Sequence, residues 1–298
     1  MTDRCLQKDI REQASLDHAD VTALNFVNAS APYVFRRHFR QGLRSHIMEI
    51  LDPSDVLTEQ TGVLKDGVRW FPKAVPRRMF RIFRRRLPTL ADALKEISRV
   101  RLVESYLAPE FMATSTECIV EYHGPGGPDL LLCGFQEYVW GEILDPWTIL
   151  DAVDLPAVLY ETFRNRGVKL TLPRNEWMGT VRQSGACFIE NIKRMITEVG
   201  HIPDLAGTGN LIITDKGNIC LVDINNISPI DFEEAIRLDE QGYPVCDKSV
   251  EALYLLESKI LGRPADEDES VYRLFLDPHR REAVRAKEEL FLKMKSAG

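Results

Sequence analysis

The sequence lacks any stretch that would suit a membrane span or a secretory leader. Its 298 residues contain no apolar run close to the roughly 20 residues that a transmembrane helix needs. The first residues, MTDRCLQKDIREQ, are charged and lack the apolar centre of a signal peptide. We therefore expect a cytoplasmic protein without a transmembrane segment.

Cysteine motifs and an excess of positive charge are missing as well. The six cysteines, at positions 5, 118, 133, 187, 220 and 246, form no Cys-x-x-Cys pair. This scatter favours reduced thiols over a zinc site or a disulfide framework. The formal net charge of −7 argues against a uniformly basic, nucleic-acid-binding chain.

The residues that are present suffice for an ordinary folded core, since 44% are hydrophobic and 28% are charged. Strand-like patterns dominate the first part of the chain and helical patterns the second, which predicts an α+β fold of two lobes. We expect a helical extension over residues 1–45, a sheet-rich lobe over 46–138 and a compact helical lobe over 139–298.

Local patterns predict the individual elements. Residues 55–76 have a strand-like pattern with a turn at Lys65-Asp66-Gly67. Apolar residues recur at helical spacing over 89–108. The stretches STECIVEYH and DLLLCGFQEYV read as strands joined by the turn GPGGPD. Further helices are predicted within 150–200, at 247–261 and at 278–295.

The candidate chemistry is concentrated in HIPDLAGTGNLIITDKGNICLVDINNIS, residues 201–228. Within it, LIITDKGNICLVDI predicts a hairpin, and the two ends of a hairpin lie close together. Asn210 precedes this hairpin and Asp223 follows it, so both side chains could face one site. Their oxygens suit Mg²⁺, which binds one or two carboxylates together with phosphate and water. Asp204, just upstream, could orient a hydroxyl nucleophile or accept its proton.

The alternative interpretation of these residues is structural. Asp204 and Asn210 would then be ordinary turn residues, and Asp223 would be a polar strand end.

This stretch resembles the catalytic loop and metal-binding segment of the protein-kinase-like superfamily, which includes aminoglycoside and choline kinases. In that family a D-x-x-x-x-N loop is followed by two short strands and the aspartate of D-F-G. Here DLAGTGN supplies Asp204 and Asn210, and LVDIN supplies Asp223. The loop is one residue longer than the family's, and Gly207 and Gly209 could absorb the extra residue.

Three further departures from the family pattern lie near this loop. Pro203 precedes the loop aspartate, where the family often has arginine or glycine, and Ile224 and Asn225 replace the phenylalanine and glycine of D-F-G.

The resemblance implies further site residues upstream. CGFQEYVWGEILDPW is similar to a kinase hinge, so backbone groups at Glu137 and Val139 would hold adenine. GVRWFPKAV is similar to the strand that carries the ATP-orienting lysine, which makes Lys73 the candidate. Its glutamate partner would be Glu104 or Glu96 on the following helix.

Other family features are missing. The sequence has no G-x-G-x-x-G near residues 50–67, no H-R-D arginine and no A-P-E element. This pattern favours a compact, atypical kinase over a regulated protein kinase.

A dense run of arginines, PRRMFRIFRRR at residues 76–86, stands out in an otherwise acidic chain. The run from Arg77 to Arg86 could bind an anionic partner such as lipid, nucleic acid or a phosphorylated substrate. The alternative interpretation is a solvated face, the more usual role of such a charge run.

Three functions therefore remain open. The first is an ATP- and Mg²⁺-dependent phosphotransferase that transfers the γ-phosphoryl group to an unidentified hydroxyl acceptor. The second is a pseudokinase that binds nucleotide or regulates a partner without turnover. The third is a non-kinase α+β binding protein whose arginine run carries the function.

Overall fold

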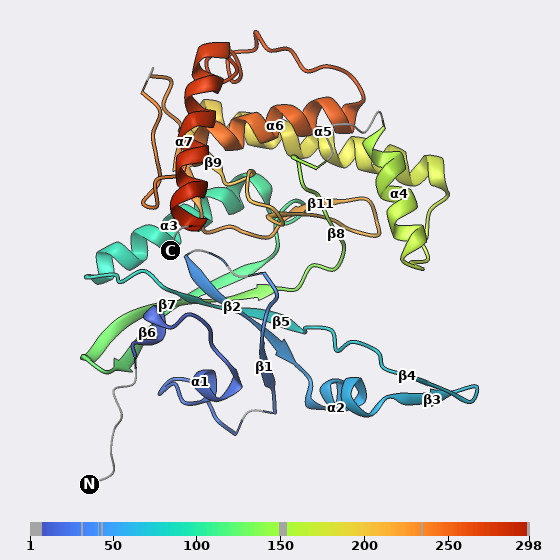
Figure 1. Cartoon of the computed structure of the whole chain (residues 1–298), viewed down its shortest axis with the longest axis vertical. Helices are drawn as coiled ribbons and strands as arrows, with labels where there is room; N and C mark the ends of the chain where they lie inside the picture. Colours follow the sequence, from blue (N-terminus) through green and yellow to red (C-terminus); the bar gives the residue numbers. More distant parts are fainter. Residues whose placement is uncertain are drawn as a thin grey trace. The chain divides into compact units, whose positions relative to one another are not determined.

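The computed structural model describes residues 8–30, 32–40, 42, 44–148, 154–233 and 235–296. The chain forms two compact units, each assembled from two stretches of sequence. Unit 1 comprises Met1–Ser98 and Thr114–Tyr138, and unit 2 comprises Arg99–Ala113 and Val139–Gly298. Helices and strands both occur (Figure 1), so the predicted α+β class is confirmed. Over the described residues, no helix combines the length and the apolar character needed to cross a bilayer.

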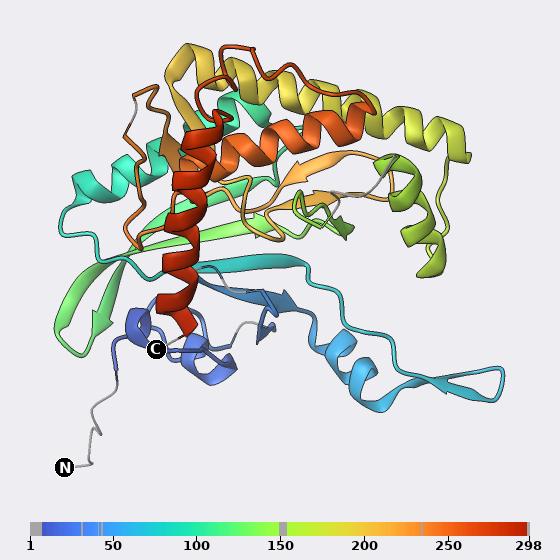
Figure 2. The same ribbon diagram turned by 45° about the horizontal axis from the view of Figure 1, so that its top comes forward.

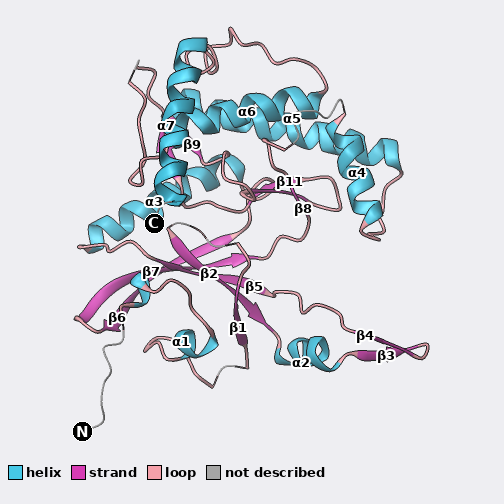
Figure 3. Cartoon of the chain, viewed as in Figure 1, coloured by secondary structure: helices cyan, strands magenta, loops and turns pink. Residues whose placement is uncertain are grey.

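Unit 1 is built on a five-stranded antiparallel sheet with the strand order β1-β2-β5-β7-β6 (Figure 3). Its strands are β1 (Val34–Arg37), β2 (Ser45–Leu51), β5 (Arg78–Phe83), β6 (Ser115–Gly124) and β7 (Gly127–Glu137). The β6–β7 hairpin confirms the two strands predicted around GPGGPD. Gly127, with a φ of 100°, supplies the left-handed backbone that this turn requires.

Apolar side chains cover both faces of this sheet. One face packs against the N-terminal residues Ile10, Leu16, Val21 and Leu24. The opposite face packs against the start of α3 (Leu90–Leu107), in a smaller cluster that contains Phe83. Neighbouring β5 residues therefore serve different cores, as alternation along a strand requires: Ile82 belongs to the first and Phe83 to the second.

The predicted helical extension over residues 1–45 is wrong where the structure describes it. Only η1 (Ile10–Glu12) and α1 (His18–Thr22) are helical there, and β1 is a strand of the sheet. The apolar residues of this segment follow the sheet surface, so no single helical stripe forms. Residues 1–7, 31, 41 and 43 of the extension lie outside the described residues.

The strand prediction for residues 55–76 holds only in part. Residues 53–61 form helix α2 (Pro53–Thr61), because Asp52 caps its first turn and Pro53 occupies a position that suits a helix start. The predicted turn is present, since Asp66 and Gly67 have φ values of 51° and 78° and join β3 (Val63–Lys65) to β4 (Val68–Trp70).

Unit 2 is mainly helical (Figure 2). Its helices are the end of α3, α4 (Leu155–Asn165), α5 (Arg174–Val199), α6 (Val245–Leu261) and α7 (Pro278–Ser296). Helices α5 and α6 approach closely at Gly185, where a Cβ atom would lie 2.4 Å from Cγ2 of Ile260. The helices predicted at 89–108, 247–261 and 278–295 are confirmed as α3, α6 and α7. Of the predicted helical stretch 150–200, residues 150–153 lie outside the described residues.

Short strands in unit 2 carry the candidate site. They form one sheet in the order β11-β10-β8 and a separate pair, β12-β9. These strands are β8 (Glu142–Ile143), β9 (His201–Pro203), β10 (Leu211–Ile213), β11 (Ile219–Leu221) and β12 (Ile227–Pro229). The predicted hairpin at 211–224 is therefore confirmed as β10 and β11, with Leu211 opposite Leu221.

Candidate functional site

The β10–β11 hairpin brings two of the predicted site residues to one end. Beyond the Leu211–Leu221 pair, the backbone nitrogen of Val222 donates to the carbonyl oxygen of Asn210 at 2.8 Å. Asp223 is the next residue, so it leaves the hairpin beside the point at which Asn210 enters it. The three-residue strands are fully buried, which fixes this end of the hairpin in the core of unit 2.

The loop from Asp204 to Asn210, which we call the Asp204 loop, is held by its own polar groups. Oδ1 of Asp204 accepts hydrogen bonds from the backbone nitrogens of Ala206 at 2.9 Å and Gly207 at 3.1 Å. Its Oδ2 accepts from Nδ2 of Asn226 at 3.1 Å. The carbonyl oxygen of Asp204 accepts from Nδ2 of Asn210 at 2.9 Å. Both ends of the loop are thus fastened to each other.

Two glycines accommodate the additional residue in this loop. A Cβ atom at position 207 would lie 2.4 Å from Nδ2 of Asn210, so any larger residue would displace that side chain. Gly209 has a φ of 91°, a backbone conformation that favours glycine. The loop therefore contains the extra residue without separating Asp204 from Asn210.

Two aspartates determine the electrostatics of the site. The pKa of Asp204 is raised to about 6, mainly by burial and also by the nearby carboxylate of Asp223, while the hydrogen bonds from Asn226, Gly207 and Ala206 oppose the change. Among the described residues, no lysine or arginine forms an ion pair with either carboxylate. The site therefore has negative charge that no ion pair with a described residue compensates.

The donor set fits a Mg²⁺ ion that also binds phosphate. Because Nδ2 of Asn210 donates to Asp204, its Oδ1 is the atom that remains for a cation. Among the described residues, the side chain of Asp223 accepts one hydrogen bond, from the nitrogen of Asn225 to Oδ1 at 3.3 Å, so Oδ2 can also face a cation. Within the described part of the chain, no group of three His, Cys, Asp or Glu residues could hold a metal ion. One carboxylate and one amide match the sparse protein ligation that Mg²⁺ takes when phosphates and waters complete its shell.

Residues that sequence reasoning missed support the Asp204 loop from the side. Nε1 of Trp147 donates to the carbonyl oxygen of Ala206 at 2.7 Å. The buried carboxylate of Asp145 accepts from Oγ1 of Thr208 at 3.4 Å and from the nitrogen of Trp147 at 3.0 Å. Nζ of Lys248 lies 4.0 Å from the centroid of a Trp147 ring. In the sequence, Asp145 and Trp147 stand only at the end of the stretch CGFQEYVWGEILDPW, where no pattern singled them out.

The predicted hinge lies at the division between the two units. Glu137 ends β7 opposite Arg78 in unit 1, and its backbone nitrogen donates to the carbonyl oxygen of Thr114 at 2.8 Å. Val139 is the first residue of the second stretch of unit 2. Gly141 is required by packing, because a Cβ atom there would lie 2.2 Å from the carbonyl oxygen of Ile213. The adenine-binding role of Glu137 and Val139 stays a prediction.

Lys73 does not lie on a strand, contrary to the expectation. Strand β4 ends at Trp70, and Lys73 follows in an exposed irregular segment. Pro72 and Pro76 flank it and lack the N–H donor that a sheet ladder needs. Its Nζ lies 5.9 Å from the centroid of the Phe39 ring, and it forms no ion pair with another described residue.

The two candidate glutamate partners of Lys73 both lie on α3. Glu96 belongs to unit 1, and its Oε1 accepts from Nη1 of Arg85 at 3.0 Å. Glu104 lies on the part of α3 that belongs to unit 2, where it is partly buried. The roles of Lys73 and Glu104 in binding nucleotide stay predictions.

The arginine run is largely neutralised by the chain itself. Arg77 binds Asp52, Arg81 binds Glu117 and Ser115, Arg84 binds the carbonyl oxygens of Arg11 and Gln13, Arg85 binds Glu96, and Arg86 binds Asp9 and Glu12. Within the run, only the guanidinium of Arg78 forms no hydrogen bond or ion pair with another described residue. The structure therefore uses most of this run as internal ties rather than as a free basic face.

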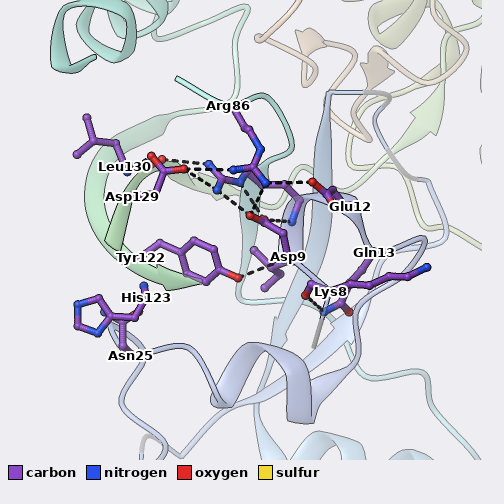
Figure 4. Close-up of polar contacts among 12 residues, drawn as sticks. Lys8, Asp9, Glu12, Gln13, Asn25, Arg86, Tyr122, His123, Asp129 and Leu130 are labelled. Carbon is purple, nitrogen blue, oxygen red and sulfur yellow. Dashed lines mark hydrogen bonds and ion pairs between the residues drawn. The ribbon is translucent and has the colours of Figure 1, made fainter. Parts of the chain in front are cut away.

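Figure 4 shows the ion pairs and hydrogen bonds around Asp9, Arg86 and Asp129 in unit 1. Arg11, almost fully buried, donates to both carboxylate oxygens of Asp9 at 2.8 and 2.9 Å and to Oδ2 of Asp129 at 2.7 Å. Nη2 of Arg86 reaches the same Asp9 at 2.9 Å. The backbone nitrogen of Ile10 donates to the hydroxyl of Tyr122 at 3.2 Å. These contacts fasten the N-terminal segment to the β6–β7 hairpin.

A pocket of about 660 Å³ in unit 2 contains none of the predicted site residues. It is lined by residues from two stretches of unit 2, namely Phe232, Ile236, Ser270, Arg273, Leu274, Asp277, Arg280 and Ala283. The guanidinium of Arg280 is already held by the carboxylate of Asp247 and by the carbonyl oxygen of Glu233.

Neither a scan against protein-family models nor a search of the curated proteins found a match to this chain.

Proposed function

We propose that the chain is an ATP- and Mg²⁺-dependent phosphotransferase whose site is formed by the Asp204 loop and the β10–β11 hairpin. One observation carries the proposal. Asp204, Asn210 and Asp223 are held within one hydrogen-bonded loop and hairpin end, and two of them are carboxylates with no cationic partner among the described residues. A magnesium-bound nucleotide would supply the missing positive charge together with a transferable phosphoryl group.

Each residue has a role that follows from its surroundings. Oδ2 of Asp223 and Oδ1 of Asn210 would hold the cation, since Oδ1 of Asp223 already accepts from Asn225 and Nδ2 of Asn210 already donates to Asp204. Asp204 would accept a proton from the acceptor hydroxyl, because a pKa of about 6 makes a carboxylate a better base near neutral pH than one of ordinary pKa. A carboxylate has about four acceptor positions, so its three loop bonds leave one for the acceptor.

A second candidate is nucleotide binding without turnover. The two oxygens of Asp204 already accept bonds from the loop, which is the geometry of a structural cap. In addition, Lys73 lies outside the sheet on which a phosphate-orienting lysine was expected. Both observations favour a module that retains magnesium and nucleotide but transfers no phosphoryl group.

The test combines binding with transfer. The melting temperature of the wild-type chain should rise with ATP and Mg²⁺ together, and more than with ATP and a chelator. Asp223→Asn should abolish this rise. Asp215→Asn is the matched control, because Asp215 lies in the turn at the opposite end of the same hairpin.

Transfer of labelled phosphate to added hydroxyl compounds then separates the two candidates. Binding with transfer supports the phosphotransferase, and binding without transfer supports the second candidate. If no nucleotide stabilises the wild-type chain, Asp223 is structural and both are wrong.

A further inference from the structure

The β3–β4 hairpin of unit 1 is an element without a core. It stands apart from the five-stranded sheet as a separate two-stranded sheet, with Val63 opposite Trp70 and Lys65 opposite Val68. Figures 1 and 2 both show it extending away from β2 and β5. Helix α2, which leads into it, has no buried residue. A two-stranded hairpin without a packed face is at best marginally stable in water. Contact with a second surface would therefore stabilise this hairpin.

Large apolar side chains occupy both faces of this hairpin. Leu64, Trp70 and Phe71 are 67%, 60% and 58% exposed. Opposed residues of an antiparallel pair share a face. One face therefore carries Val63, Val68 and Trp70 together with Lys65, and the other carries Leu64 opposite Arg69. Exposed apolar surface concentrated in this way marks an interaction site.

The charge of the segment is opposite to that of the chain. Residues 63–78 contain five basic residues, Lys65, Arg69, Lys73, Arg77 and Arg78, and one acidic residue, Asp66. The chain as a whole has a net charge of −7. Lys65 and Arg78 have no ion-pair partner among the described residues, in contrast to most of the neighbouring arginine run. Within the hairpin itself Lys65 and Arg69 outnumber Asp66, and Lys73, Arg77 and Arg78 lie in the chain that follows it. The hairpin and the segment after it are therefore apolar and locally cationic.

We propose that the β3–β4 hairpin docks the chain onto an anionic lipid surface. A protein partner with a flat surface would cover one face of the hairpin and leave the other in water. The interfacial region of a bilayer surrounds an inserted hairpin, so it covers Leu64 and Trp70 together. Tryptophan and phenylalanine favour that region, and basic side chains can extend from it to the anionic headgroups.

The geometry also limits the depth of insertion. Both strands of the hairpin are edges, because β3 and β4 pair only with each other. Unpaired backbone groups are not tolerated in the hydrocarbon region. The hairpin therefore lies among the headgroups, and binding depends on both its apolar residues and its charge.

The test is co-sedimentation of the full chain with lipid vesicles. The wild-type chain should bind phosphatidylcholine vesicles that contain phosphatidylserine, and should bind pure phosphatidylcholine weakly. Raising the salt from about 0.1 M to about 1 M should weaken binding, because the Debye length falls from about 10 Å to about 3 Å. Trp70→Ala/Phe71→Ala should lower the vesicle partition coefficient at least about tenfold. Lys65→Glu should lower it for anionic vesicles.

Matched controls come from α3 in the same unit. Leu94→Ala and Lys95→Glu change an exposed leucine and an exposed lysine there, and should leave vesicle binding unchanged. Unchanged melting temperatures of the hairpin variants would show that they remain folded.

Two results would overturn the proposal. One is equal binding of wild type and both hairpin variants. The other is no vesicle binding together with a wild-type dimer, seen by sedimentation velocity, that Trp70→Ala/Phe71→Ala dissociates. The hairpin would then be an interface between copies of this chain.

Discussion

Two pairs of aspartates, one in each unit, have opposite electrostatic surroundings. In unit 1, hydrogen bonds from Arg11 lower the pKa of both Asp9 and Asp129. In unit 2, burial and the carboxylate of Asp223 raise the pKa of Asp204 to about 6. The first pair has its counter-charge within the chain and fastens the N-terminal segment. The second pair has none among the described residues, which is the arrangement that an external cation would complete.

The largest expected effect concerns the compensated pair. Arg11→Met removes a guanidinium that is 2% exposed and leaves Asp9, itself 8% exposed, without its closest partner. Breaking a buried ion pair from one side typically costs about 3–5 kcal/mol, because the remaining charge stays buried. We expect that loss in the free energy of unfolding, measured by urea denaturation at neutral pH.

Arg86→Met is the control for this effect, because Arg86 binds the same Asp9 but is 57% exposed. It should cost no more than about 1 kcal/mol. Equal losses for the two variants would show that burial does not distinguish these arginines.

The next effect concerns the uncompensated pair. Asp204→Ala removes three hydrogen bonds that hold the Asp204 loop, and loss of such a cap costs about 1–2 kcal/mol. If Asp204 also serves as the base, ATP binding should persist while turnover falls sharply. Melting temperature, nucleotide titration and a transfer assay measure the three quantities separately. A stable variant with full turnover would contradict both roles.

The stability effect of Asp204 should depend on pH with a defined sign. Its folded pKa of about 6 lies above its ordinary value of 3.8, so the folded state binds the proton more tightly than the unfolded state. The resulting stabilisation is full below the unfolded pKa and is lost as the pH rises through about 6. Asp204→Ala should therefore be more destabilising at acidic than at neutral pH, as measured by unfolding across this range. The opposite trend would mean that the carboxylate is charged and paired.

Asp9 and Asp129 should show the reverse sign. Their folded pKa values lie below 3.8, so their contribution is present above that pH and is lost on further acidification. In Arg11→Met, the free energy of unfolding should therefore fall less on acidification than in the wild-type chain. An equal fall in both proteins would show that Arg11 does not set the two pKa values.

The smallest expected effect is that of the Asp223 charge on the pKa of Asp204 in unit 2. Asp223→Asn removes the neighbouring charge but leaves Asp204 buried, so the pKa of Asp204 should fall only part of the way from about 6 toward 3.8. Titration of the Asp204 carboxyl carbon by NMR measures the change. No fall would show that the two carboxylates do not interact.

The sequence predicted those elements whose signals, a turn motif or a helical periodicity, lie within the element itself. The turns GPGGPD and Lys65-Asp66-Gly67 lie where they were expected, as do α3, α6 and α7. The failures came from competing local signals. Asp52 and Pro53 start a helix inside a strand-like stretch, and prolines on both sides of Lys73 keep it out of a ladder.

The candidate site was predictable only where its residues are close in sequence. The proximity of Asn210 and Asp223 follows from one hairpin, but their chemical roles stay predictions. The bonds from Trp147 to Ala206 and from Arg11 to Asp129 join residues that are far apart in sequence. Such pairs depend on tertiary structure, and no short-range pattern indicates them. For the same reason, the sequence does not show that most of the arginine run is paired within the chain.

The interrupted sequence of unit 2 has a consequence for synthesis of the chain. Residues 99–113 leave the ribosome between the strands of unit 1, yet the backbone of Ala113 bonds to Leu221, which is made much later. Domains tend to fold as they emerge, so unit 1 can complete its sheet once β7 is available. Val103 and Leu107 are buried in the core of the folded unit 2, so they lack their packing partners until the rest of unit 2 has been synthesised. A nascent chain that has released β7 from the ribosome, but has not yet synthesised β11, would thus present an apolar helix end to chaperones while its first unit is already folded.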